Sequence, residues 1–106
     1  MTRISFFYDG NGRINGFELN GHAGYGESGT DIVCSAVSVL VFNTINSIES
    51  FSKSEFDIEQ DKEKGRICFK LRNGADSEAE LLLNSLKLGL TSVRDSYGKK
   101  YIRIEK

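Results

Sequence analysis

The chain has 106 residues, enough for one domain (1–106) with a buried core and too few for two. Its 14 lysine and arginine residues nearly balance 15 aspartate and glutamate residues, so its charge does not indicate a nucleic-acid or membrane-surface binder. No basic and apolar leader follows Met1, and no uninterrupted apolar run reaches membrane-spanning length. We therefore expect a soluble, cytoplasmic protein. Two cysteines and one histidine are too few for a structural zinc site, so we expect no metal, and we expect no cofactor. The two cysteines could form one disulfide, but an intracellular location disfavours it.

The first half of the chain predicts a hairpin followed by a long helix. Alternating apolar residues predict strands over 3–9 and 14–20, joined by an Asp-Gly-Asn-Gly turn, with Gly16 marking a bulge. A helix is expected from the residue after Asp31 to about Ser52, with a buried stripe of Val33, Val37, Leu40, Thr44, Ile48 and Phe51. Further apolar residues widen this stripe beyond one face: Val39, Val41 and Phe42. A helix that is apolar nearly all round is usually covered on two sides, and a subunit partner is one candidate for the second.

The second half repeats the order of elements. Alternation predicts strands over 56–60 and 67–71 around a charged turn at 61–65. Ser77 and Glu80 predict a capping box for a second helix, whose buried stripe is Ala79, Leu82, Leu83, Leu86, Leu90 and Val93. A last strand is expected over 99–105. The order β-β-α-β-β-α-β predicts an α+β fold, in which an antiparallel or mixed sheet and two helices pack as a sandwich.

The candidate catalytic residues lie between Gly21 and Ser38. If Asp31 is the N-cap, Cys34 is the third residue of the helix, where the helix dipole favours a thiolate, the nucleophilic form of cysteine. Free backbone amides from Val33 to Ser35 would then be available to stabilise an oxyanion. The alternative is that Cys34 is a small buried hydrophobic residue of the helix.

The only histidine of the chain, His22, lies at the end of the second predicted strand and is the candidate general base for Cys34. The alternative is a surface histidine bound to its own loop. Asp31 either caps the helix or orients His22, and capping alone accounts for its type and position. Ser38 lies one helical turn after Cys34, where its hydroxyl could contact the thiol or a substrate, or bond back to a helix carbonyl.

The loop before the helix is rich in glycine, with Gly21, Gly24, Gly26 and Gly29. Its letters fit the dinucleotide motif G-x-G-x-x-G, but hairpins rather than parallel βαβ strands surround it, and acidic residues lie where a pyrophosphate would bind. We interpret the glycines as giving a flexible loop that opens for a peptide. Cys68 has neither a helix end nor a nearby histidine and is expected to be structural and replaceable.

The segments Gly21-His22-Ala23-Gly24 and 29–38, with sequence GTDIVCSAVS, resemble the ribosomal-processing cysteine protease (Prp) family. The resemblance implies that His22 and Cys34 are catalytic, that Asp31 and Ser38 support them, and that the protein is a homodimer with a moving loop over its cleft. It also implies a substrate, the N-terminal extension of bacterial large-subunit ribosomal protein twenty-seven. The alternative function is a non-catalytic, ribosome-associated binding module.

Overall fold

The computed structural model describes residues 1–27 and 30–105. The elements follow the order β-β-α-β-β-α-β, as predicted. Five strands form one mixed sheet with the spatial order β3-β4-β2-β1-β5, in which β1 and β5 run parallel and the other neighbours run antiparallel. The bounds are β1 Thr2–Tyr8, β2 Ile14–Asn20, α1 Ile32–Phe51, β3 Phe56–Asp61, β4 Arg66–Leu71, α2 Ser77–Tyr97 and β5 Ile102–Glu105.

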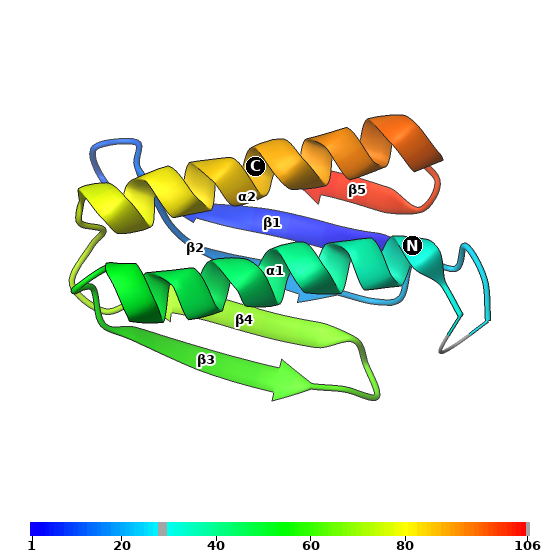
Figure 1. The fold of residues 1–106 in the computed structure, drawn as a ribbon, viewed down its shortest axis with the longest axis horizontal. Helices are drawn as coiled ribbons and strands as arrows, with labels where there is room; N and C mark the ends of the chain where they lie inside the picture. Colours follow the sequence, from blue (N-terminus) through cyan, green and yellow to red (C-terminus); the bar gives the residue numbers. More distant parts are fainter. Residues whose placement is uncertain (28–29, 106) are drawn as a thin grey trace.

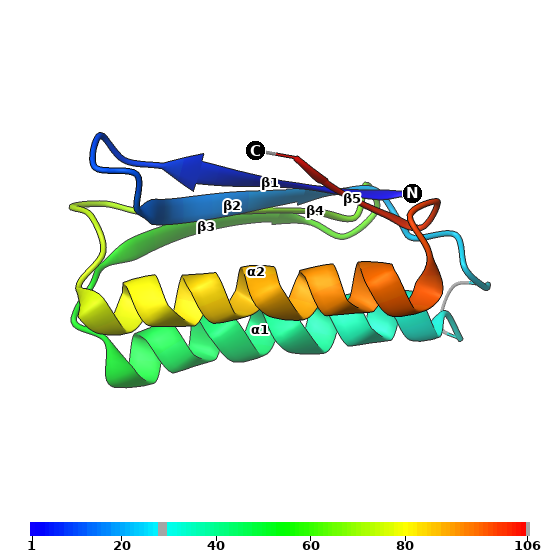
Figure 2. The same cartoon turned by 90° about the horizontal axis from the view of Figure 1, so that it is seen from above.

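The molecule has two layers, with α1 and α2 side by side against one face of the sheet (Figures 1 and 2). The core lies between these layers. The rings of Phe17 and Phe69 stack there with centroids 5.1 Å apart, and both side chains are 0% exposed. Alternation in β2 and β4 sends these aromatic residues inward and the charged residues between them to the open face. The α+β sandwich is therefore the fold that the pattern of apolar residues predicts.

One local prediction in the sheet is confirmed and one is wrong. The register of β1 and β2 shifts where Phe7 pairs with Gly16 and Tyr8 with Ile14, so an extra residue bulges out beside Gly16. A Cβ atom on Gly16 would lie 2.4 Å from the backbone oxygen of Phe69, which explains the glycine. The last strand begins at Ile102 rather than at residue 99, because residues 99–101 form a turn before pairing with β1 begins.

The two helices begin differently from one another. Asp31 caps α1 as predicted, accepting hydrogen bonds from the amides of Val33 and Cys34. The predicted capping box of α2 is wrong: its N-cap is Asp76, whose carboxylate accepts from the amide of Ala79, and Ser77 is already inside the helix. Asp76 also accepts from the Ser52 hydroxyl and the Lys53 amide, so it joins the end of α1 to the start of α2. Sequence reasoning favoured the serine because these long-range partners are not visible locally.

The face of α1 turned away from the sheet exposes Ile32, Val39 and Phe42 among polar residues such as Asn43 and Asn46. The buried residues of α1 lie on the opposite face, toward the sheet: Val33, Val37, Val41, Thr44, Ile45 and Ile48. Phe51, which we predicted to be buried, is 73% exposed because it is the last helical residue and lies beyond the sheet-facing stripe. By length and composition alone α1 could cross a membrane, although polar residues such as Ser38 and Asn43 interrupt its apolar sequence as expected. Core helices of soluble proteins pass the same test, and the inner face of α1 packs in the core described above.

Candidate functional site

Three segments distant in sequence meet at one end of the molecule. The chain just after β2 carries His22, and the first turn of α1 carries Cys34. The β3–β4 turn lies at the same end of the molecule as these two segments (Figures 1 and 2). The antiparallel pairing of β2 with β4 brings the β3–β4 turn to this end. The sheet topology thus assembles the site from otherwise separate pieces of chain.

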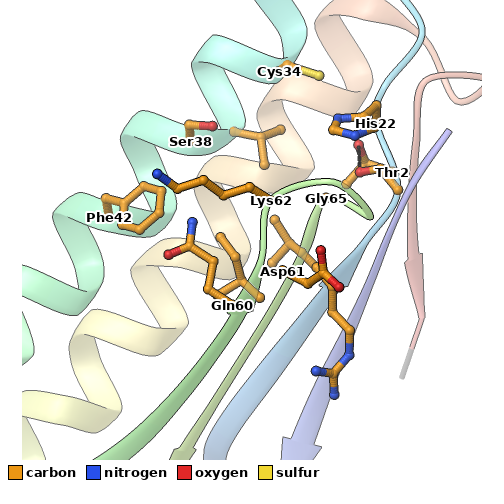
Figure 3. Close-up of a pocket in the computed structure, with 14 residues that line it drawn as sticks. Thr2, His22, Cys34, Ser38, Phe42, Gln60, Asp61, Lys62 and Gly65 are labelled. Atoms are coloured by element: carbon orange, nitrogen blue, oxygen red, sulfur yellow. Dashed lines mark hydrogen bonds between the residues drawn. The ribbon is translucent and has the colours of Figure 1, made fainter.

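Two cavities border Cys34, His22 and Ser38. The first, of about 220 Å³, lies between α1 and the β3–β4 hairpin (Figure 3). Its apolar lining residues include Leu19, Val37, Phe42 and Ile67, and its polar lining residues include Gln60, Asp61, Lys62 and Arg66. The second, of about 570 Å³, lies toward the glycine-rich loop and is lined by Gly24, Gly26, Asp31, Ser35 and Val39 in addition to the three shared residues. A chain that crossed from one cavity to the other would pass these three side chains.

Cys34 is the third residue of α1, as predicted, and is half-buried. Its sulfur accepts a hydrogen bond from the backbone amide of Ala23 at 3.3 Å. Cys34 lines both cavities, so the residue is not enclosed in the core. In Figure 3 it projects from the helix toward the side of the cavity where His22 lies.

Asp31 joins the loop to the helix through both carboxylate oxygens. Oδ1 accepts from the amides of Val33 and Cys34 at 2.9 and 3.0 Å, and Oδ2 accepts from the amides of Tyr25 and Gly26 at 2.9 and 3.1 Å. Burial raises the pKa of this carboxyl group, but the four amide donors outweigh that effect and leave the pKa below its ordinary value. The capping prediction is therefore confirmed.

These contacts change two other expectations about Asp31. Its hydrogen-bond partners are backbone amides rather than the His22 ring, so it does not orient His22 by direct contact in this arrangement. The amides of Val33 and Cys34 are taken by its side chain and that of Ser35 by its backbone oxygen. The expectation of free amides from Val33 to Ser35 is therefore wrong: the capping residue that creates the helix end also occupies its donors.

His22 is exposed, and its ring contacts a different segment from the one we predicted. Nε2 lies 3.2 Å from the backbone oxygen of Glu63 in the β3–β4 turn. Sequence reasoning missed this partner because a main-chain oxygen carries no residue signature. Ser38 is exposed on α1 and borders both cavities, one turn beyond Cys34.

The glycine-rich loop is held by contacts at Tyr25. Its ring packs edge-on against Tyr97 and Tyr101, with centroids 5.6 and 4.9 Å apart. Gly21 and Gly24 both have positive φ, which requires glycine there, and Gly26 binds Asp31. Gly29, the last of the predicted loop glycines, lies outside the described residues.

The second cysteine lies away from this site. Cys68 pairs with Glu18 and Glu59 in the sheet and borders a shallow cavity with Asp57, Arg66 and Lys70 on the open face. Within residues 1–27 and 30–105, no group of three or more histidine, cysteine or acidic side chains is placed to hold a metal ion.

Comparison with known proteins assigns a family to this arrangement. The family model described as "Cysteine protease Prp" matches residues 1–103. The chain belongs to the Prp family of cysteine proteases. The ribosomal processing cysteine protease Prp of Staphylococcus aureus is 26% identical over 99 residues, which span 93% of each chain. The Bacillus subtilis Prp is 28% identical over 88 residues, 79% of each chain.

Solved Prp structures share the whole fold. The S. aureus Prp in complex with a covalently linked product peptide superposes with a TM-score of 0.92 at 27% identity, covering 99% of this chain and 98% of that one. The S. aureus Prp in complex with a substrate peptide gives a TM-score of 0.86 at 26% identity with the same coverage. The chain is therefore a ribosomal-processing cysteine protease by family, with the fold of relatives that were solved with peptides.

Proposed function

We propose that this protein is a cytoplasmic endopeptidase that removes the N-terminal extension of large-subunit ribosomal protein twenty-seven, with Cys34 as nucleophile and His22 as general base. The observation that carries the proposal is that Cys34, which is half-buried, and His22, which is exposed, line the same two cavities. Membership of the Prp family supports the reaction class. The substrate is the one implied by the resemblance described above.

The proposed reaction proceeds in two stages. His22 takes the proton of the Cys34 thiol, the sulfur bonds to the scissile carbonyl carbon, and the carbonyl electrons move to its oxygen. When the C–N bond breaks, the leaving amine takes the proton from His22 and an acyl-enzyme remains. Water then attacks the acyl carbon, His22 accepts its proton, and the thiolate leaves. The Ala23 amide, already directed at the sulfur, is the donor best placed to stabilise charge on the reacting atoms.

The two cavities suit an extended peptide. The apolar lining at Val37 and Ile67 can contact an apolar side chain of the peptide, while Gln60 and Lys62 can hydrogen-bond the peptide backbone. The second cavity would hold the chain on the other side of the scissile bond, beside Gly24 and Gly26. Loop movement that admits the peptide is part of this proposal.

The test compares two cysteine variants. Cys34→Ala should abolish cleavage of a peptide spanning the processing sequence, with an unchanged circular dichroism spectrum, because the nucleophile alone is lost. Cys68→Ala should cleave at close to the original rate, because Cys68 lies on the open face of the sheet. Cleavage by Cys34→Ala would refute the proposed mechanism, and peptide binding without cleavage by the unmodified protein would favour a non-catalytic binding module.

We also propose a homodimer that covers the outward face of α1. Ile32, Val39 and Phe42 there are 50%, 68% and 36% exposed, and such apolar side chains gain free energy when another surface covers them. Sedimentation equilibrium should give twice the mass of 11.8 kDa, and Val39→Lys should lower it. A single-chain mass for the unmodified protein at micromolar concentration would remove this part of the proposal.

A further inference from the structure

The β3–β4 turn contacts His22 directly. Nε2 of His22 lies 3.2 Å from the backbone oxygen of Glu63. A carbonyl oxygen only accepts hydrogen bonds, so Nε2 carries the hydrogen in this contact. In the neutral ring Nδ1 then has the free lone pair and is the nitrogen able to accept a proton.

The turn that supplies this oxygen is itself tightly ordered. The Asp61 carboxylate accepts from the amides of Glu63 and Lys64 at 3.1 and 3.2 Å. The amide of Gly21, next to His22, donates to the backbone oxygen of Lys64 at 3.2 Å. The turn is thus fixed internally by Asp61 and docked on the end of β2 by two hydrogen bonds.

Gly65 allows the turn to approach so closely. Its φ is +61°, and an added Cβ atom would lie 2.9 Å from the Gly21 oxygen and 3.1 Å from Cε1 of His22. A side chain at this position would push the turn away from the histidine. The ring is therefore packed against the turn as well as hydrogen-bonded to it.

We propose that the turn formed by residues 61–65 is the positioning element of His22, and that the Glu63 oxygen selects the ring form with hydrogen on Nε2 and a free Nδ1. This inference rests on the proposed role of His22 as general base. Nδ1 takes the proton from the Cys34 thiol and later gives it to the leaving amine, while the Nε2–H bond to Glu63 persists throughout. The main-chain oxygen of Glu63 thus orients the His22 ring, a role that the sequence left open for Asp31.

The chain offers matched control positions in the β1–β2 turn, at the other end of the sheet. Gly65→Ala introduces a side chain at positive φ beside His22. Gly12→Ala introduces one at φ +79° with nothing within 4 Å of the new atom. Similarly, Asp61→Ala removes the acceptor that orders the β3–β4 turn, whereas Asp9→Ala removes the equivalent acceptor for the Asn11 and Arg13 amides. The two glycine variants each add a side chain at positive φ, and the two aspartate variants each remove an acceptor of turn amides. One member of each pair lies beside His22, and the other lies at the far end of the sheet.

His22 is the only histidine, so a long-range ¹H–¹⁵N spectrum of the imidazole reports on one residue. Without substrate and with the ring neutral, the unmodified protein should give a protonated Nε2 and an unprotonated Nδ1. Gly65→Ala and Asp61→Ala should give mixed tautomers, and kcat for a substrate peptide should fall by about 10- to 100-fold, more than any rise in KM. Gly12→Ala and Asp9→Ala should match the unmodified protein in both measurements.

A protonated Nδ1 in the unmodified protein would overturn the inference, as would unchanged tautomers in both variants of the 61–65 turn. If Gly65→Ala does not fold, Asp61→Ala and the unmodified spectrum still decide. The outcome is separate from that of the proposed function: the spectrum needs no catalysis, and cleavage by Cys34→Ala would refute the function while leaving the tautomer result in place.

Discussion

Replacing Asp31 with asparagine tests how the glycine-rich loop is held on the helix start. Asparagine has one acceptor oxygen and one NH₂ group, whereas the aspartate accepts from four amides with two oxygens. Asparagine is a good N-cap, so we expect it to keep the bonds to Val33 and Cys34 and to turn its NH₂ group toward the Tyr25 and Gly26 amides. The loop then loses its attachment while the helix keeps its cap.

The expected loss of stability depends on whether water can replace each lost hydrogen bond. The Tyr25 and Gly26 amides belong to exposed residues that can bind water instead, so Asp31→Asn should lower the free energy of unfolding by only about 1 kcal/mol. Asp31→Ala also removes the cap and should cost about 1 kcal/mol more. Because His22 and Ala23 immediately precede the released loop, kcat/KM of Asp31→Asn should fall about tenfold, equivalent to about 1.4 kcal/mol of transition-state stabilisation.

The assay combines urea unfolding, followed by circular dichroism, with initial rates on a fluorogenic peptide. Asp76→Asn is the matched control, because Asp76 caps α2 far from the cavities and should lower stability without lowering kcat/KM. Since the pKa of Asp31 is lowered on folding, its stabilising effect is present above the ordinary pKa of 3.8 and is lost as pH falls through the folded value. The stability difference between the protein and Asp31→Asn should therefore shrink in acid. An unchanged kcat/KM in Asp31→Asn, or an equal loss in Asp76→Asn, would refute the reasoning.

Three further predictions concern the core, the loop and the link between the helices. Phe69→Ala should lower the free energy of unfolding by about 3–5 kcal/mol in urea, because the ring is 0% exposed and stacked in the core; a loss below about 1 kcal/mol would contradict that packing. Tyr25→Ala removes two edge-on aromatic contacts and should speed limited proteolysis within residues 21–30 while leaving the urea midpoint nearly unchanged, and equal cleavage rates would show that the ring does not hold the loop. Amide and hydroxyl donors lower the pKa of Asp76 from 3.8 to about 2, so its stabilising effect is lost as pH falls toward 2. Asp76→Asn should therefore reduce the pH dependence of the free energy of unfolding between about pH 4 and pH 2.

The fold was predictable because its determinants are local and periodic. Alternation placed β2 at its observed bounds, and an aspartate followed by an apolar helical stripe located the start of α1. The same stripe failed at Phe51, because periodicity does not reveal where the sheet beneath a helix ends. Likewise Ser77 is a residue type that caps helices, but Asp76 is the cap, and it also binds Ser52 and Lys53, which are distant in sequence.

The positions of the candidate residues follow from the sequence more readily than their contacts do. The only histidine and the cysteine beside a helix cap predict His22 and Cys34 as a catalytic pair, and the topology brings both residues to the same cavities. The partners of these residues could not be predicted, since the Glu63 oxygen and the Ala23 amide are main-chain atoms present at every position. The contact of Tyr25 with Tyr97 and Tyr101 depends on the path of the chain after α2, which no local pattern encodes.

The most direct test of the account is the rate at which iodoacetamide modifies Cys34 at pH 7, followed by peptide mapping. The account predicts that Cys34 in the folded protein reacts faster than the same cysteine in the urea-unfolded chain, and that His22→Gln slows the reaction. A folded-state rate no higher than the unfolded one, together with no effect of His22→Gln, would contradict the claim that this thiol is an activated nucleophile.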